Sequence, residues 1–325
     1  MSNYYTKACN FYYGSISVEK VKKKLSLPLH GNKLISFDNI EIISRKSITR
    51  INFKKVKKLK SQLRKKILFD IKQISKKKKF RGLKFSNFPI LMGVLNLTPN
   101  SFSDGGKYNK KKLGVKHAKK LIKDGCSILD IGGEATNPGS DEVEINKEWK
   151  RIYPTLSKIK KLNTLISLDT RKSEIIKKGI TNKINLVNDV SGFDYDSNMI
   201  KVLKETKIPF VIHHMQGNPK TMQKNPKYNN VILDIYDFFE KKIKFIRSLG
   251  IKHNNIILDP GIGFGKNLKH NIILLRNISI FHSLGFPVML GTSRKRFIKD
   301  LSGANDSKER LGGTISSSLI AIMQG

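Results

Sequence analysis

The stretch from Pro89 to Gly106 reads PILMGVLNLTPNSFSDGG, and it decides how the rest of the chain is interpreted. Its first part is an apolar run with the length of a buried strand, which ends at Asn96. The second part is too long for a hairpin turn and too polar for a core. Loops that follow the strands of a parallel sheet often carry binding residues. We therefore interpret residues 89–106 as a core strand followed by a functional loop.

The same alternation continues along the sequence. Six further apolar runs are each followed by a polar, glycine-containing loop and a helical stretch. These strand candidates are SILDIGG, TLISLDT, INLVNDV, PFVIHH, NIILDPG and FPVMLGT, and the predicted helices lie around 110–124, 144–161, 172–179, 196–206, 231–249, 267–277 and 308–323. Strands that alternate with helices indicate βαβ units and a parallel sheet. Seven units over about 235 residues predict an α/β fold of the (β/α)8 TIM-barrel type, one unit short.

Residues 1–87 differ from residues 88–325 in their composition and in their pattern of apolar residues. We expect them to form a Lys-rich N-terminal extension of the barrel. They contain a β-like piece, LISFDNIEII, and a cationic helical piece with one apolar stripe. The stripe residues are Val56, Leu59, Leu63, Ile67, Ile71 and Ile74. We expect this stripe to dock on the main domain rather than to lie on a membrane surface.

The chain carries a formal net charge of +38, which is unevenly distributed. Residues 1–88 hold 24 Lys and Arg against 4 Asp and Glu, whereas residues 89–325 hold 39 against 21. Such a balance suits nucleic acid or anionic membranes. The lysines are scattered over helices instead of alternating with aromatic residues, which favours solvated faces in a lysine-biased proteome. We expect neither nucleic acid nor membrane as a partner, although a positive surface attracts anionic substrates such as phosphates.

Cysteine usage and the absence of long apolar runs in the sequence indicate a cytoplasmic protein. Cys9 and Cys126 are isolated, with neither metal-ligand spacing nor a disulfide framework, as in a reducing compartment. The N-terminus lacks the basic-then-apolar order of a signal peptide. No run reaches the roughly 18 apolar residues of a membrane span.

Polar residues cluster at the carboxyl ends of the predicted strands. They are Asn96, Asp130, Asp169, Asn188, His213, His214 and Asp259, with Ser293 and Lys295 just beyond the seventh strand. A single Asp at such a position is usually a helix cap or a turn residue. So many on six strands indicate a site, because parallel strands of a barrel open on one face.

The residue types predict part of the chemistry of this face. Two carboxylates, Asp169 and Asp259, with the amide of Asn188, suit a flat heterocycle that has amidine-like N–H groups. GTSRKRF places hydroxyl and cationic groups where barrels commonly bind phosphate. Asn96 is a candidate oxygen ligand for Mg²⁺ that bridges a pyrophosphate. GGEATNPGS, after the second strand, is a candidate lid, in which Thr136 is favoured over Glu134 as the functional residue.

Two other motifs, the GIGFGK loop and the pair His213–His214, are weaker indications of a functional site. GIGFGK, Gly261 to Lys266, matches neither the dinucleotide fingerprint nor the Walker spacing. We interpret it as backbone room for a ligand, with Phe264 as a stacking face. His213 and His214 are adjacent on a strand, so that at most one enters the pocket, and we expect structural roles for them.

Together these stretches resemble the dihydropteroate synthase family. The matching motifs, in order and spacing, are GVLNLTPNSFSDGG, LDIGGEATNPG, ISLDTRKSE, LVNDVSG, HHMQGNPKTMQ, LDPGIGFGKN, GTSRKRFI and ERLGGT. The resemblance covers residues 88–325 and implies a TIM-barrel transferase of folate biosynthesis. Such an enzyme joins 6-hydroxymethyl-7,8-dihydropterin pyrophosphate to p-aminobenzoate, giving 7,8-dihydropteroate and pyrophosphate. Mg²⁺ as cofactor and a homodimer are also implied.

The resemblance also implies roles for single residues. Asn96 would ligate Mg²⁺ on the pyrophosphate, and Thr136 with its loop would bind pyrophosphate and close over p-aminobenzoate. Phe102, Phe264 and Ser293 would line that second pocket. The residues implied to hold the pterin are Asp169, Asn188, Asp259 and Lys295, with Asp130 as a further substrate-binding residue. Catalysis would depend on Asn96, Thr136, Asp169 and Lys295, through charge stabilisation and orientation, with no covalent enzyme nucleophile.

Two departures from the family pattern stand out. The second loop usually reads Ser-Thr-Arg-Pro-Gly, whereas this chain has Ala-Thr-Asn-Pro-Gly at 135–139, so that Asn137 lacks a cation. The family continues beyond AIMQG into an eighth strand with an Arg-x-His anion site, whereas this sequence ends at Gly325. We expect unpaired strand edges and an open core there. Alternative hypotheses are a non-catalytic or altered-specificity pterin-binding paralogue and another pterin-binding barrel, such as a methyltetrahydrofolate methyltransferase.

Overall fold

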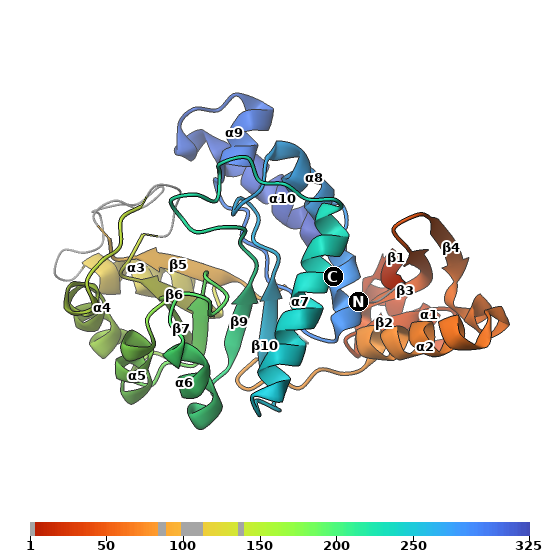
Figure 1. The fold of residues 1–325 in the computed structure, drawn as a ribbon, viewed down its shortest axis with the longest axis horizontal. Coiled ribbons are helices and arrows are strands. Elements are labelled where there is room, and N and C mark those ends of the chain that lie inside the picture. The colour runs from red at the N-terminus through yellow and green to blue at the C-terminus, as the bar shows by residue number, and fades with distance from the viewer. Residues whose placement is uncertain (1–3, 84–88, 99–112, 136–139) are drawn as a thin grey trace.

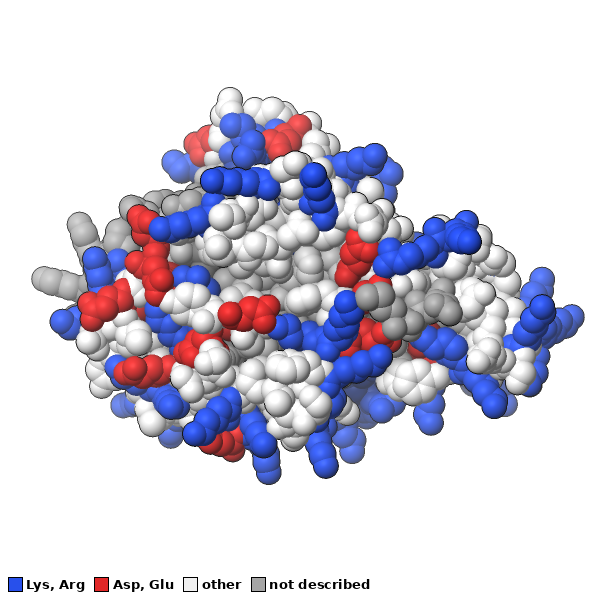
Figure 2. All heavy atoms as spheres, in the orientation of Figure 1, with Lys and Arg blue, Asp and Glu red and all other residues white. Residues whose placement is uncertain are grey.

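The computed structural model describes residues 4–83, 89–98, 113–135 and 140–325. A parallel α/β barrel region and a smaller antiparallel sheet with two helices lie side by side (Figure 1). Lys and Arg side chains are spread over both parts on the face shown in Figure 2. Within the described ranges, no helix has the length and apolarity to cross a bilayer.

The barrel sheet contains six parallel strands in chain order. They are β5 (Met92–Asn96), β6 (Ile128–Gly132), β7 (Leu165–Asp169), β8 (Leu186–Asp189), β9 (Phe210–His213) and β10 (Ile256–Asp259). Because the strands are parallel and consecutive, their carboxyl ends lie at one edge of the sheet. Six of the seven predicted strands are therefore present, and the expected α/β class is confirmed.

The seventh predicted strand, FPVMLGT, is not a regular strand. It makes one parallel bridge, between Leu258 and Val288. Two backbone hydrogen bonds accompany it, from Leu258 N to Pro287 O at 2.9 Å and from Met289 N to Leu258 O at 2.8 Å. On the other side of the sheet, β5 pairs with β6 alone among the described strands. A cavity of about 370 Å³ lies between β5 and this segment, lined mainly by apolar residues that include Val94, Val288 and Ile322.

The predicted helices of the barrel region are all present within a few residues. They are α3 (Leu113–Lys123), α4 (Ile145–Ile159), α5 (Ser173–Thr181), α6 (Asn198–Thr206), α7 (Val231–Ser248), α8 (Leu268–Leu275) and α10 (Leu311–Ile322). Their apolar faces meet the strands in a core that contains Leu129, Leu168 and Leu258, each fully buried. Additional short helices are η3 (Ile278–Leu284), α9 (Arg296–Ser302) and η4 (Ser307–Arg310).

The N-terminal part forms its own sheet. Its elements are β1 (Tyr5–Tyr13), α1 (Gly14–Lys22), β2 (Leu27–Leu29), β3 (Asn32–Ile43), β4 (Ile48–Asn52), η1 (Phe53–Lys58) and α2 (Ser61–Ser75). The predicted β-like piece corresponds to β3, which pairs with the other three strands. The predicted helix is divided, because Leu59 is extended and separates η1 from α2.

The expected docking of the apolar stripe on the main domain is wrong for most of its residues. Val56, Ile67, Ile71 and Ile74 are buried in a cluster with strand residues of the N-terminal sheet, such as Phe37. A four-stranded sheet needs a covered apolar face to be stable. The stripe of α2 supplies that cover.

The N-terminal sheet docks on α7 and η3 through polar and aromatic residues that lie away from the cluster covered by α2. Tyr5 packs edge-on against Tyr236 with ring centroids 5.0 Å apart, and its hydroxyl donates to Asp237 at 2.8 Å. Arg45 also pairs with Asp237, at 2.9 Å. His30 and His282 make a further contact, with nitrogens 3.0 Å apart. The extension is therefore anchored to the barrel by directional polar contacts as well as by packing.

Candidate active site

The polar residues at the strand ends are brought together by the register of the sheet. Asp169 lies beside Asn188, and Asp259 lies beside His213. Asn188 reaches Asp130 across β7, with its Nδ2 donating to Asp130 Oδ2 at 3.0 Å. The predicted convergence of Asp130, Asp169 and Asn188 is thus observed in the fold, while their roles stay predictions.

Three buried oxygens of this cluster have no hydrogen-bond partner: Asp130 Oδ1, Asp169 Oδ1 and Asn188 Oδ1. The hydrogen bond to Asp130 uses the amide nitrogen of Asn188, so that the amide oxygen of Asn188 is left without a partner. A buried acceptor without a partner costs about 1–3 kcal/mol. Three of them together therefore favour a ligand that presents several N–H groups along one edge.

The electrostatics of the cluster favour the same kind of ligand. Burial, followed by the charge of Asp130, raises the pKa of Asp169 well above its usual range. Burial also raises the pKa of Asp130. Neighbouring buried carboxylates of like charge hold a proton between them unless another group compensates. Donated N–H bonds from a ligand stabilise the ionised form.

Lys295 supplies the cation of the site. Its ammonium bonds the carbonyl oxygen of Ile262 and lies 4.6 Å from the ring centroid of Phe264. Burial lowers the pKa of Lys295 to about 8, an effect opposed by the charge of Asp259. The ring of Phe264 in turn meets His213 edge-on, at 4.7 Å. A carboxylate, an ammonium and an aromatic face therefore adjoin one another.

Two glycines of GIGFGK serve close backbone approach within the protein, and the interpretation of the loop as room for a ligand stays a prediction. Gly261 has φ +68°, and a Cβ there would lie 2.1 Å from His214 O. At Gly265, with φ +59°, a Cβ would lie 2.8 Å from Gln216 O. Both contacts are with the connection that follows β9. The same loop orients Asp259, whose Oδ1 accepts from Gly261 N at 2.7 Å.

The two adjacent histidines have structural partners, as expected. His213 Nδ1 donates to Val190 O at 2.8 Å, and burial lowers its pKa to about 4. His214 Nδ1 lies 3.0 Å from the ammonium of Lys266. Lys266 was not predicted as a site residue. It is buried, and burial lowers its pKa well below the usual range.

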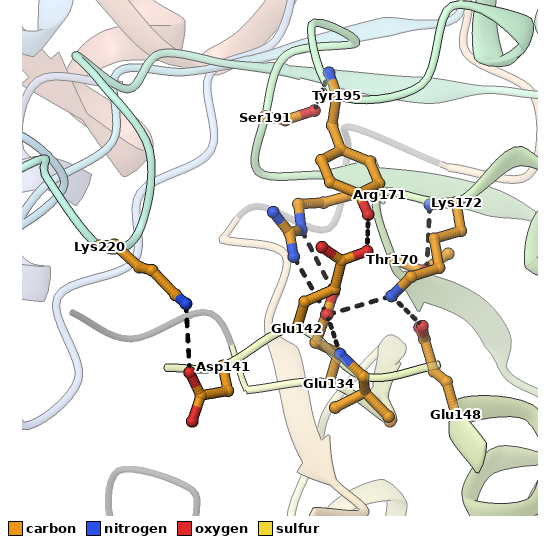
Figure 3. A network of polar contacts seen from close by, with 12 residues as sticks. Glu134, Asp141, Glu142, Glu148, Thr170, Arg171, Lys172, Ser191, Tyr195 and Lys220 are labelled. Atoms are coloured by element: carbon orange, nitrogen blue, oxygen red, sulfur yellow. Dashed lines mark hydrogen bonds and ion pairs between the residues drawn. The ribbon is translucent and has the colours of Figure 1, made fainter. Parts of the chain in front are cut away.

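Figure 3 shows a buried ion-pair network around Glu134. The charges of Glu148 and Glu134 in this network act on Asp169 of the carboxylate cluster. The carboxylate of Glu134 pairs with Arg171 at 3.0 Å and with Lys172 at 3.0 Å, and Lys172 also pairs with Glu148 at 2.8 Å. From the sequence, Glu134 ranks below Thr136 as a functional residue of this loop. It does accept from Val143 N at 2.9 Å, but the ion pairs make it the centre of a larger network. Sequence reasoning missed this because the ion-pair partners of Glu134 are 37 and 38 residues away along the chain.

The remaining predicted residues are less informative. Phe102, Thr136 and Asn137 lie outside the described residues. Ser293 is exposed and lines the apolar cavity next to β5. Asn96 is half-buried at the end of β5, where the next residue bonds Gly132 O at 2.8 Å. In the ranges that the structure describes, no three His, Cys, Asp or Glu side chains form a metal-binding group.

A sequence profile described as pterin binding enzyme matches residues 92–325, so the chain belongs to the family of pterin-binding enzymes. Relatives within this family include dihydropteroate synthases. That of Escherichia coli K12 is 41% identical over 238 residues, which cover 73% of this chain and 84% of the relative. That of a Synechocystis strain is 38% identical over 236 residues, covering 72% and 82%.

Solved structures agree with this assignment. Yersinia pestis dihydropteroate synthase with a sulfonamide drug has a TM-score of 0.73 and 36% identity, covering 76% of this chain and 90% of its own. The Xanthomonas albilineans enzyme in complex with 7,8-dihydropteroate has a TM-score of 0.65 and 29% identity, covering 74% and 86%. The predicted TIM-barrel fold, enzyme class and dihydropteroate synthase function are confirmed over the paralogue alternative.

Proposed function

We propose that this chain joins 6-hydroxymethyl-7,8-dihydropterin pyrophosphate to p-aminobenzoate, with 7,8-dihydropteroate and pyrophosphate as products. The observation that supports these substrates is the set of unpartnered oxygens on Asp130, Asp169 and Asn188. Lys295 is linked to this set through Asp259, whose charge acts on both Asp130 and Lys295. A pterin ring presents amino and ring N–H donors along one edge and a carbonyl acceptor beside them. The donors match the three oxygens, and the carbonyl matches the ammonium.

Catalysis in this proposal is orientation and charge stabilisation. The C–O bond to pyrophosphate breaks with both electrons leaving on oxygen, and the aryl amine of p-aminobenzoate forms the new C–N bond and releases a proton. The carboxyl groups of Asp169 and Asp259 stabilise positive charge that develops on the pterin methylene. Phe264 supplies a ring face beside Lys295 and would contact the aryl substrate together with Phe102 and Ser293. Thr136 would bind the departing pyrophosphate.

Mg²⁺ is part of the proposal, with Asn96 as its protein ligand. A single amide oxygen suits this ion, because Mg²⁺ commonly keeps several waters and is bound through one or two side chains plus substrate phosphates. The ion would neutralise charge on the pyrophosphate. We further propose a homodimer in the cytoplasm, and a division into an extension, residues 1–87, and a catalytic domain, residues 88–325.

The test is a coupled measurement of binding and turnover on the purified chain. Pterin binding is followed by fluorescence quenching with 6-hydroxymethylpterin, and turnover by release of pyrophosphate with both substrates and Mg²⁺. We expect binding and turnover, with loss of both in Asn188→Ala. Pterin binding without turnover would favour a non-catalytic paralogue, and absence of both would refute the proposed function.

A further inference from the structure

The ion-pair network in Figure 3 joins the connections that follow four successive strands. Glu134 and Glu142 belong to the β6–α4 connection, Arg171 to the β7–α5 connection and Tyr195 to the β8–α6 connection. The guanidinium of Arg171 lies 4.2 Å from the ring centroid of Tyr195, and the hydroxyl of Tyr195 bonds Glu142. At the exposed rim, Lys220 after β9 pairs with Asp141 at 3.3 Å. Such contacts hold neighbouring loops in one arrangement.

Glu134 is the best-connected member of this network. Its side chain is 1% exposed, and its two oxygens accept from Val143 N, Arg171 and Lys172. The bond to Val143 ties together two points of the β6–α4 connection that are nine residues apart. A second tie comes from Arg151 of α4, which donates to Gly133 O at 2.7 Å. Both described stems of the connection are therefore held at its base.

The β7–α5 connection, on the other side of the network, is held in place by several contacts of its own. Thr170, which precedes the two basic residues, donates from its backbone N to Asn188 O at 3.1 Å. Lys172 is held by Glu148 of α4, whose side chain is fully buried. Ser173 N donates to Asp196 at 2.8 Å. The β7–α5 connection therefore has contacts that do not involve Glu134, whereas Glu134 is the described residue that ties the β6–α4 stems to Arg171 and Lys172.

We propose that Glu134 is a positioning residue for the transfer reaction, which sets the β6–α4 connection against the end of β7 through Arg171 and Lys172. The inference rests on the proposed function, because Thr136 lies in sequence between the two stems. Among the described residues, Glu134 pairs with Arg171, Lys172 and Val143 and not with Asp130, Asp169 or Asn188. Its charge helps to raise the pKa of Asp169. Its loss therefore impairs handling of the pyrophosphate and of the second substrate, and does not weaken binding of the pterin ring.

The variant Glu134→Gln tests this, because it keeps the size of the side chain and removes its charge. A misplacement of about 1 Å in a catalytic group can lower a rate by about 100-fold. We expect the KM for pterin pyrophosphate to rise and kcat to fall, each by about tenfold or more, whereas the Kd of 6-hydroxymethylpterin changes less than about twofold. Glu174→Gln is the matched control, since it breaks an exposed pair with Lys178 at 3.3 Å on α5 and should alter neither.

If the role of Glu134 is purely structural, Glu134→Gln lowers the melting temperature and the active fraction of the enzyme without changing the KM for either substrate. That result would overturn the proposal. An equal loss of 6-hydroxymethylpterin binding would also overturn it. If Glu134→Gln does not fold, Arg171→Lys decides instead, because it keeps the charge but loses the two-point contact and the stacking on Tyr195. We then expect the KM for pterin pyrophosphate to rise about threefold or more, and unchanged constants would refute the proposal. Wild-type turnover, measured first, separates these outcomes from failure of the proposed function.

Discussion

Asp169→Asn should stabilise the protein and weaken its binding of pterin. The carboxylate of Asp169 is buried, one of its oxygens has no partner, and it lies near the charges of Asp130 and Asp189. The amide of Asn has nearly the same shape and carries no charge. The substitution therefore removes the cost of keeping a poorly compensated carboxyl group inside the folded protein.

The two effects have comparable size and opposite sign. An unpartnered buried group costs more when it is charged than when it is neutral, so removal of the charge should raise the free energy of unfolding, by about 1–3 kcal/mol. In a chain of this size this is several degrees in melting temperature. A hydrogen bond to a charged group contributes about 1.5–3 kcal/mol, so the Kd for 6-hydroxymethylpterin should rise by roughly 10- to 150-fold.

The pH dependence provides a second signature. The pKa of Asp169 is raised in the folded state, so its ionised form opposes folding at pH values above the unfolded pKa of about 3.9. This cost begins to shrink as the pH falls through the raised folded pKa and is gone below the unfolded pKa. The stabilisation of Asp169→Asn over the wild type should therefore be largest at neutral and higher pH and shrink as the solution is acidified.

The assay is thermal melting with and without 6-hydroxymethylpterin, at pH values from 5 to about 8, where the difference should be visible. Asp141→Asn serves as control, because the side chain of Asp141 is 92% exposed and outside the carboxylate cluster. A variant that melts below the wild type, or one that binds pterin with unchanged affinity, would contradict the reasoning. A lower melting temperature would mean that Asp169 already has a compensating partner, and an unchanged affinity would mean that Asp169 does not bind the pterin.

Three other substitutions test separate parts of the structure. Lys295→Met should lower kcat/KM by roughly 10- to 150-fold. Wild-type activity should decline above a pH of about 8, where the ammonium of Lys295, with a pKa of about 8, loses its proton, and the variant should lack this decline. An unchanged pH–rate profile would contradict this. Gly261→Ala should destabilise the fold by more than about 2 kcal/mol, because its Cβ would lie 2.1 Å from His214 O, and an unaltered urea midpoint would refute it. Arg45→Gln should lower the melting temperature by about 2–4 °C through loss of its pair with Asp237, while kcat measured at 25 °C stays unchanged.

The barrel and the position of its site were predictable from the sequence because each signal there is local. An apolar run followed by Asn96, Asp130 or Asp169 identifies both a strand and the end at which its polar residue lies. The parallel arrangement then brings these ends together without further information. The site predicted in this way is the carboxylate cluster and Lys295.

Features that depend on contacts distant in sequence were not predicted. The stripe on α2 was recognised, but its partner was not, because an apolar face does not specify what covers it. Glu134 has the appearance of a loop residue until Arg171 and Lys172 are placed beside it. The glycines near Gly261 indicated close approach, yet the approaching group, His214 O, belongs to another connection. The seventh apolar run lacked a ladder partner along most of its length.

The docking of the N-terminal sheet has a consequence for synthesis on the ribosome. The hydroxyl of Tyr5 bonds Asp237, which is 232 residues further along the chain. At a translation rate of about 5–20 residues per second, the face that carries Tyr5 waits for about 10–50 s before its partner emerges. The sheet has its own core around Phe37 and Ile67, so it can form within that time. Its aromatic docking face is then open to chaperones, and to other nascent chains on the same message, until α7 and η3 arrive.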